Sequence, residues 1–556
     1  MLLVACTLVV LAATSTPPTA APPQASGPHP PSEEALRRFI QGRLLEERGQ
    51  RDLALSEYSR ALLLDDGSVA LARRVSEASA LAGDPARSLE FAERALKIAP
   101  DDARALWLKG AALLNLQRGG EALAPLEASV AVDSEHVEYL RTLARAAEAQ
   151  DRIDIVVRSY RRVAFLDPED AESWFQLAAG EARLGRFGAA DTALHEAAEM
   201  NPLRPGMPFL QGWIDENLGR TSQALDLYRL HLAAHPDDGL TRRRTIRLLA
   251  QGRRYDEAFR EARALTRAEP EDREAAGIAA DLAFAAKRTS DGQQVLQSMR
   301  RRWPDDPEVL AAAVAILGRY DLAKQGVAEA EGWASRHADD YRGHIVAARA
   351  RVLDKQPDAA LQHLERAVAM VPDSLAPRAV LARFYQDQKR WKDAERAWVE
   401  ARTRFPSVDG LSFDLAACRE KLGDLAGAEA AARDVLAREP ENPTALNFLG
   451  YLWADHGENL EQALDMIERA LAHDPDNGAF VDSLGWAYYR LGRMGEARTQ
   501  LERAARLTGG DPEVLEHLGD IYKDLALKDL AREQYRLCLA ADPANARVKA
   551  KLDSLH

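Results

Sequence analysis

The side chains best suited to chemistry in this chain are its histidines, and their spacing is poor for a catalytic or metal site. His231 and His235 lie one helical turn apart and could share a metal ion, but no third ligand is evident. Residues 195–199 read HEAAE and lack the second histidine of a zinc-peptidase helix. We therefore interpret these histidines as solvated groups near helix ends.

The three cysteines also show no pattern typical of a reactive or metal-binding site. Cys6, Cys418 and Cys538 are too few for a disulfide framework and have no C-x-x-C spacing. Cys418 and Cys538 fall in helical patterns where small apolar residues recur, which predicts two buried core thiols.

Motifs of the common enzyme classes are missing. The chain has no G-x-x-x-x-G-K-[ST] phosphate loop, no G-x-S-x-G elbow and no H-E-x-x-H pair. Paired carboxylates at 46–47 and 237–238 fall where helix surfaces or repeat junctions are expected, and we interpret them as solvated charge. The sequence therefore predicts a protein that is not an enzyme, with no cofactor and no metal.

Charge further narrows the function. The formal net charge is -14, from 73 basic and 87 acidic residues. Binding of nucleic acid depends on concentrated Lys and Arg, so this balance argues against nucleic acid as a partner. The hydrophobic fraction of 46% and charged fraction of 29% are those of a folded soluble protein.

A sequence repeat predicts the helices that position all these residues. Prolines that end a helical pattern recur at gaps that are multiples of 34 residues: Pro100, Pro168, Pro202, Pro236, Pro270, Pro304, Pro372, Pro406 and Pro440. The series then continues one residue late, at Pro475, Gly509 and Pro543.

Aligning the chain on these prolines predicts fifteen repeats. Their first residues are 35, 69, 103, 137, 171, 205, 239, 273, 307, 341, 375, 409, 443, 478 and 512. The eighth and twentieth residues of the repeats are nearly all Gly, Ala or Ser, as at Gly519 and Ala531. Small residues let two helix axes approach closely, so each repeat is predicted to be a pair of tightly crossing helices.

This pattern resembles the tetratricopeptide repeat (TPR), whose length is 34 residues, across residues 35–545. The resemblance implies an all-α fold, a right-handed superhelical solenoid of about fifteen helix-turn-helix repeats, which binds other proteins. Residues 546–556 carry apolar residues among charged ones and are predicted to form a C-terminal capping helix.

The N-terminus points to export. Residues 1–21 contain the uncharged apolar run LLVACTLVVLAA, which is too short to span a bilayer and about right for a signal-peptide core. Residues 22–34, rich in Pro and Ala, read as a tether. Residues 3–6, LVAC, resemble a bacterial lipobox, which would make Cys6 a lipidation site and the only link to a membrane. Simple cleavage and a cytoplasmic apolar tail remain open alternatives.

The resemblance to TPR proteins implies that residues 2, 5, 9 and 12 of each first helix line a partner-binding groove. The candidate groove residues are Arg141, Arg145, Arg243, Arg247, Arg349, Arg383, Phe413, Asn447, Tyr451, Asp482, Trp486 and Tyr489. Asp482, Glu513, Glu516 and Asp520 make the end of this groove acidic, whereas its middle is basic. The alternative is that Tyr451 and Trp486 only pack between repeats.

Residues 444–543, with the run DSLGW, resemble the C-terminal part of Gram-negative outer-membrane TPR lipoproteins. A member of that group is an adaptor for a periplasmic carboxyl-terminal processing protease that degrades cell-wall hydrolases. The resemblance implies an envelope scaffold, in the periplasm or on the outer membrane, whose partners are such a protease or hydrolase. The alternative function is a cytoplasmic TPR protein that sequesters a signalling partner.

Overall fold

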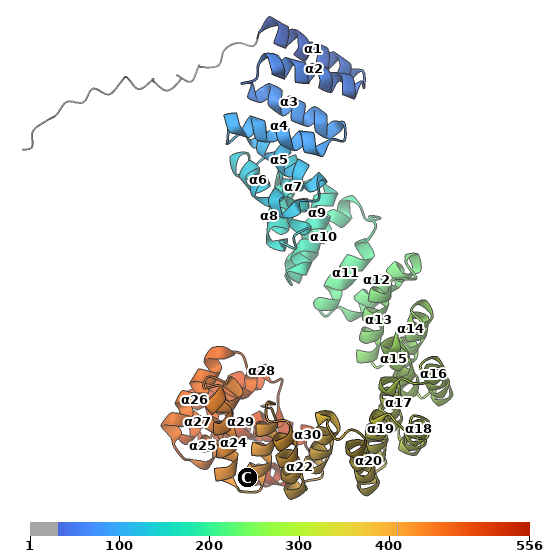
Figure 1. Ribbon diagram of the computed structural model, residues 1–556, viewed down its shortest axis with the longest axis vertical. Coiled ribbons are helices and arrows are strands. Elements are labelled where there is room, and N and C mark those ends of the chain that lie inside the picture. The colour runs from blue at the N-terminus through green and yellow to red at the C-terminus, as the bar shows by residue number, and fades with distance from the viewer. Residues whose placement is uncertain (1–31, 409, 556) are drawn as a thin grey trace, which may run out of the picture. The chain divides into compact units, whose positions relative to one another are not determined.

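The computed structural model describes residues 32–408 and 410–555, which form helices joined by short turns (Figure 1). Within these residues there are 31 α-helices and no β-strand. Consecutive helices pack in pairs, and α31 follows the last pair. The predicted all-helical repeat fold is therefore confirmed. The apolar segment 1–21, including Cys6, lies outside the described residues.

The chain divides into two compact units, residues 1–261 and 262–556. The first unit contains the helices α1 (Glu33–Glu47), α2 (Arg51–Leu64), α3 (Val69–Leu81), α4 (Pro85–Ile98), α5 (Ala103–Asn115), α6 (Gly119–Val132), α7 (Val137–Glu148), α8 (Ile153–Leu166), α9 (Ala171–Arg183), α10 (Phe187–Met200), α11 (Met207–Asn217), α12 (Thr221–Ala234) and α13 (Gly239–Gln251). Helix α14 (Tyr255–Ala268) includes the boundary between the units.

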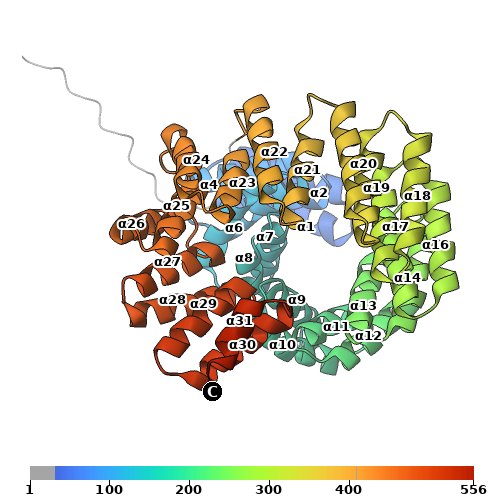
Figure 2. The same ribbon diagram turned by 90° about the horizontal axis from the view of Figure 1, so that it is seen from below.

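The second unit contains the helices α15 (Arg273–Ala285), α16 (Thr289–Arg302), α17 (Pro307–Arg319), α18 (Ala323–Arg336), α19 (Tyr341–Leu353), α20 (Pro357–Met370), α21 (Leu375–Asp387), α22 (Trp391–Arg404), α23 (Gly410–Lys421), α24 (Leu425–Arg438), α25 (Pro443–His456), α26 (Leu460–His473), α27 (Gly478–Arg490), α28 (Met494–Leu507), α29 (Pro512–Asp524), α30 (Lys528–Ala541) and α31 (Ala546–Asp553). Figure 2 shows α27, α29 and α31 on the inner side of this unit's curve, with α26, α28 and α30 outside them.

Two first helices begin at positions that differ from the sequence expectation. Helix α1 begins at Glu33 rather than 35, because the Ser32 side chain accepts a hydrogen bond from the Ala35 N–H and caps the helix. Helix α1 therefore begins two residues before the predicted start of the first repeat. Helix α11 begins at Met207 rather than 205, because the preceding Gly206 adopts a left-handed conformation with φ of 84°.

The turn inside each repeat contains a residue with positive φ, which ends the first helix. At Gly492 this conformation costs little, since glycine has no Cβ. Ala526 holds the same position one repeat later, with φ of 59°, and carries the steric cost of a side chain there.

The two helices of a repeat cross closely at the small residues, as the repeat pattern predicts. A Cβ built on Gly519 in α29 would lie 2.5 Å from a ring carbon of Tyr535 in α30. In α27, a Cβ on Gly485 would lie 2.6 Å from Leu501 of α28. The large side chain of the second helix thus fills the space that glycine leaves in the first. Cys418 and Cys538 are buried in this helix packing, which confirms that prediction.

Helix α31 covers the end of the last repeat. Its residue Val548 is fully buried, and the following Leu555 is nearly so, in a core cluster that includes Tyr535 and Cys538. Its outer residues are charged, so the stack of repeats ends in a polar surface.

Candidate functional site

The predicted groove arginines of the first unit lie on α7 and α13, and two of them already have acidic partners. Arg141 donates to the Asp170 carboxylate at 2.6 Å, while Arg145 is exposed one turn away. On α13, the exposed Arg247 pairs with Glu216, and Arg243 is half-buried. At least two of the four positive charges that the sequence places here are therefore balanced within the unit.

The predicted basic residues of the second unit are more available. Arg349 on α19 is exposed and has no ion pair with any residue that the structure describes. Arg383 on α21 keeps 66% of its side chain exposed, and its nearest carboxylate, that of Asp414, lies 4.0 Å away. These two guanidinium groups are open to a ligand.

The next first helices along the unit are nearly uncharged at the candidate positions. Phe413 of α23 lies against Phe448 of α25, with ring centroids 6.5 Å apart. The side-chain oxygen of Asn447 is buried and accepts no hydrogen bond within the described part of the chain.

The last three first helices, α25, α27 and α29, bring Tyr451, Trp486 and Tyr489 into one cluster. Trp486 stacks on His517 with ring centroids 4.1 Å apart, and Tyr489 lies 4.9 Å from Trp486 on its own helix. The Trp486 indole N–H donates to the Asp455 carboxylate at 3.1 Å. Trp486 is only 8% exposed, so most of its surface packs between repeats.

Hydrogen bonds hold the two tyrosines in place. The Tyr451 hydroxyl donates to the Glu513 carboxylate at 3.1 Å, and the Tyr489 hydroxyl donates to Asp524 at 2.6 Å. Burial, followed by the charges of Glu513 and Asp455, raises the pKa of Tyr451 above its usual range. Both hydroxyls therefore remain protonated donors, and their rings present fixed, half-buried surfaces.

Asp482 and Glu516 do not offer the free charge that the sequence suggested. Asp482 is buried and lies 3.1 Å from the buried His517 ring nitrogen Nδ1. Glu516 is 2% exposed and accepts hydrogen bonds from Arg547 at 2.8 Å and Lys551 at 2.6 Å. Asp482 is thus buried beside a hydrogen-bonding imidazole, and Glu516 beside two cations that compensate the cost of its desolvation.

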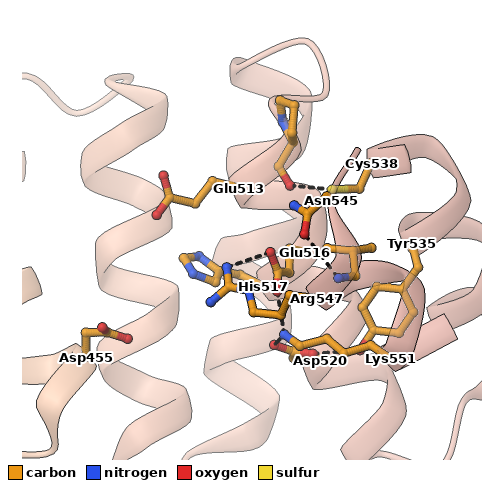
Figure 3. A network of polar contacts seen from close by, with 12 residues as sticks. Asp455, Glu513, Glu516, His517, Asp520, Tyr535, Cys538, Asn545, Arg547 and Lys551 are labelled. Atoms are coloured by element: carbon orange, nitrogen blue, oxygen red, sulfur yellow. Dashed lines mark hydrogen bonds and ion pairs between the residues drawn. The ribbon is translucent and has the colours of Figure 1, made fainter. Parts of the chain in front are cut away.

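Figure 3 shows how the capping helix α31 reaches this cluster. Lys551 lies between the carboxylates of Glu516 and Asp520, and Asp520 also accepts a hydrogen bond from the Tyr535 hydroxyl at 2.6 Å. The carboxylates of Glu513 and Asp455 lie on the side away from α31 (Figure 3). At the acidic end, Glu516 and Asp520 are therefore paired with cations of α31, whereas Glu513 and Asp455 are not.

His517 is the titratable group at the centre of the cluster. Burial disfavours its charged form, but the nearby Asp482, with Glu513 and Asp520, outweighs burial and raises the pKa of His517. Its position was not recognised from sequence, nor were those of Asp455, Arg547 and Lys551. The sequence signal for the contact between Asp482 and His517 was their separation of 35 residues, about one repeat, which places them on neighbouring first helices.

Some charges taken from sequence as solvated are instead structural. Glu46 accepts a hydrogen bond from the Tyr58 hydroxyl at 2.7 Å and pairs with Arg74 of the next repeat. Asp238 caps α13 and lies 2.9 Å from the His231 ring. Both interactions link consecutive repeats or helices, which a reading of one helix at a time does not reveal.

No group of three or more His, Cys, Asp or Glu side chains among the described residues is arranged to hold a metal ion. None of the helices in that part of the chain has the length and apolar composition needed to cross a membrane.

Comparison with known families finds tetratricopeptide-repeat models matching residues 82–136, 177–239, 244–307, 352–398, 413–478, 457–512 and 483–546. Together these segments make up more than half of the chain.

Among curated proteins, the TPR repeat-containing protein PA4667 of Pseudomonas aeruginosa is 35% identical over 168 residues. The match covers 29% of this chain and 28% of that protein, so the chain matches less than a third of the relative's length. Among solved structures, Naa15/Naa10 bound to HypK-THB is 14% identical, with a TM-score of 0.43 and coverage of 94% and 96% of the two chains. YrrB, a TPR protein with an unusual peptide-binding site, is 18% identical, with a TM-score of 0.29 and coverage of 32% and 92%.

Proposed function

This chain belongs to the tetratricopeptide-repeat family, and we propose that it is a non-catalytic adaptor of the bacterial cell envelope. In this role it holds an enzyme and its protein substrates on the first helices of its repeats. The partner class is a periplasmic carboxyl-terminal processing protease or a cell-wall hydrolase.

The observation that carries the proposal is the ordered surface at α25, α27 and α29. Tyr451 and Tyr489 are half-buried, and each is fixed by a hydrogen bond to a carboxylate. Aromatic groups that are already ordered lose little conformational entropy on binding, and buried aromatic anchors dominate the energetics of many protein interfaces.

The envelope location is supported by two sequence features. Residues 2–13 form an uncharged apolar run of signal-peptide length, and Cys6 lies in a lipobox-like tetrapeptide. The partial match to a Pseudomonas aeruginosa protein favours a bacterial origin for this protein. We infer export, followed either by simple cleavage of the signal peptide or by lipidation of Cys6.

The location is tested by fractionating native cells and following the chain with an antibody. Export predicts a processed protein in the envelope or periplasm, and Cys6→Ser should release it from the membrane only if the cysteine is lipidated. An unprocessed protein found in the cytosol contradicts export and favours the alternative, a cytoplasmic TPR regulator.

The partner class is tested by affinity capture from envelope and cytosolic fractions, with identification by mass spectrometry. The test variant combines Tyr489→Ala and Glu513→Ala, and the matched control combines Tyr341→Ala and Glu308→Ala. The proposal expects a processing protease or cell-wall hydrolase that is lost only with the test variant. Retention of cytosolic signalling proteins alone contradicts it.

A further inference from the structure

Two exposed cations and two carboxylates lie at different places along the first helices of the second unit. Cations lie on α19 and α21, at Arg349 and Arg383, and carboxylates lie on α25 and α29, at Asp455 and Glu513. We call the surface formed by these helices and the intervening α23 the polarised face.

At the basic end, the two guanidinium groups have little internal compensation. Arg349 forms no ion pair with a described residue, and the carboxylate of Asp414 is 4.0 Å from Arg383. A guanidinium group presents several N–H donors in a plane that matches a carboxylate, so this end fits an acidic side chain.

At the acidic end, Glu513 and Asp455 accept hydrogen bonds only from the neutral side chains of Tyr451 and Trp486. Neither carboxylate pairs with a Lys or Arg side chain within the described residues. The imidazole of His517 is bound to Asp482, and Arg490 is bound to the backbone carbonyl of Asp455.

The neighbouring carboxylates of α29 show that Lys and Arg side chains bind on this helix. On the other side of α29, Glu516 and Asp520 receive Lys551 and Arg547 from α31 (Figure 3). Glu513 and Asp455 lack an equivalent cation from this part of the chain, and charge complementarity therefore assigns them a Lys or Arg of a partner.

Between the two ends, the polarised face carries small and aromatic side chains. Ala379 and Ala417 are small and half-buried, and Phe413 offers an aromatic surface. Asn447 presents a buried side-chain oxygen with no donor among the described residues.

We propose that the polarised face binds an extended peptide segment of a partner protein, with an acidic residue at α19 and α21 and a basic residue at α25 and α29. This inference rests on the proposed function, because it specifies the partner for the same surface. Neighbouring packed helices are about 8–10 Å apart, and an extended chain advances about 3.3 Å per residue. The four first-helix spacings from Arg383 on α21 to Glu513 on α29 therefore correspond to about ten to twelve residues.

The test is selection of a phage-displayed library of random 16-residue peptides on the purified full chain. The expected result is enrichment of peptides that carry Asp or Glu at one end and Lys or Arg about ten to twelve residues away. No enrichment, or enrichment of peptides without this charge pattern, overturns the proposal.

Matched variants locate the binding. Glu513 and Glu308 occupy the same place in two identical PEVL segments, at 512–515 and 307–310. Glu513→Lys should weaken the selected peptide about fivefold, the upper range for an exposed ion pair, whereas Glu308→Lys should not weaken it. Arg383→Glu is compared in the same way with Arg396→Glu on α22, whose side chain is 76% exposed. Equal binding by the test and control variants overturns the assignment.

The outcome is independent of where the protein works in the cell. Peptide selection uses purified protein, so a cytosolic location would contradict the envelope adaptor and leave the polarised face intact. Conversely, capture of a periplasmic protease with no charge pattern in the selected peptides would contradict only the peptide inference.

Discussion

Tyr451 and Glu513 are 62 residues apart in the chain, yet the tyrosine hydroxyl donates to the carboxylate at 3.1 Å. Tyr451 lies on α25 and Glu513 on α29, so the hydrogen bond passes over the repeat that begins with α27. Because α27 contacts both of these helices, the bond ties three consecutive repeats at the surface assigned to the partner.

Removing this hydroxyl should weaken the C-terminal repeats. Tyr451→Phe keeps the ring and removes one hydrogen bond to a charged acceptor, so we expect the free energy of unfolding to fall by about 1–2 kcal/mol. The measurement is urea unfolding of the full chain, with Tyr341→Phe as the control. An unchanged midpoint for Tyr451→Phe would show that the bond adds no net stability.

His517 should make the stability of this region depend on pH. Its pKa is raised in the folded state by Asp482, Glu513 and Asp520 against the effect of burial. A raised pKa gives stabilisation that is complete below the unfolded value of about 6.5 and is lost as pH rises through the folded value. The stability difference between wild type and His517→Gln should therefore shrink from pH 6 to pH 9.

Thermal unfolding of both proteins across that pH range measures the difference. The ring of His517 also stacks on Trp486, and the loss of that contact is the same at every pH. A difference that stays constant or grows as pH rises would contradict the proposed coupling to Asp482.

The cations of α31 should be needed to keep Glu516 buried. Removing Arg547 and Lys551 together leaves a carboxylate that is 2% exposed without the partners that compensate its desolvation. We expect the double change Arg547→Ala with Lys551→Ala to cost about 3–5 kcal/mol, as for a broken buried ion pair. Chemical unfolding measures this cost, and Lys549→Ala, at an exposed position of the same helix, should cost almost nothing.

The turn residue Ala526 should be a site of stabilisation. A residue with a side chain pays about 1–2 kcal/mol in the left-handed conformation, and the greater freedom of unfolded glycine returns part of this difference. Ala526→Gly should therefore increase the free energy of unfolding by about 0.5–1 kcal/mol. The measurement is the midpoint temperature of thermal unfolding, which should rise.

The reverse change at the equivalent turn is the control. Gly492 has the same conformation, and an added Cβ would meet no atom within 4 Å, so Gly492→Ala tests the backbone cost alone. It should destabilise by a similar amount. A lower midpoint for Ala526→Gly would contradict this account of the turn.

Much of the fold could be predicted from sequence because its determinants are local and repeated. The period of 34 residues places the helix pairs, and small residues such as Gly519 mark where the helices cross. The boundary at Gly206 was missed because its left-handed conformation is set by the surrounding turn and not by the repeat.

The sequence by itself determined the helix pairs and their approximate number, because both follow from a 34-residue period that recurs along the chain. The tertiary structure alone decided which charges remain open. Asp482 and Glu513 lie on the first helices of consecutive repeats, but the first is hydrogen-bonded to the His517 ring, while the second accepts a hydrogen bond from the Tyr451 hydroxyl. The packing of neighbouring first helices decides which side chains come within hydrogen-bonding distance of each carboxylate.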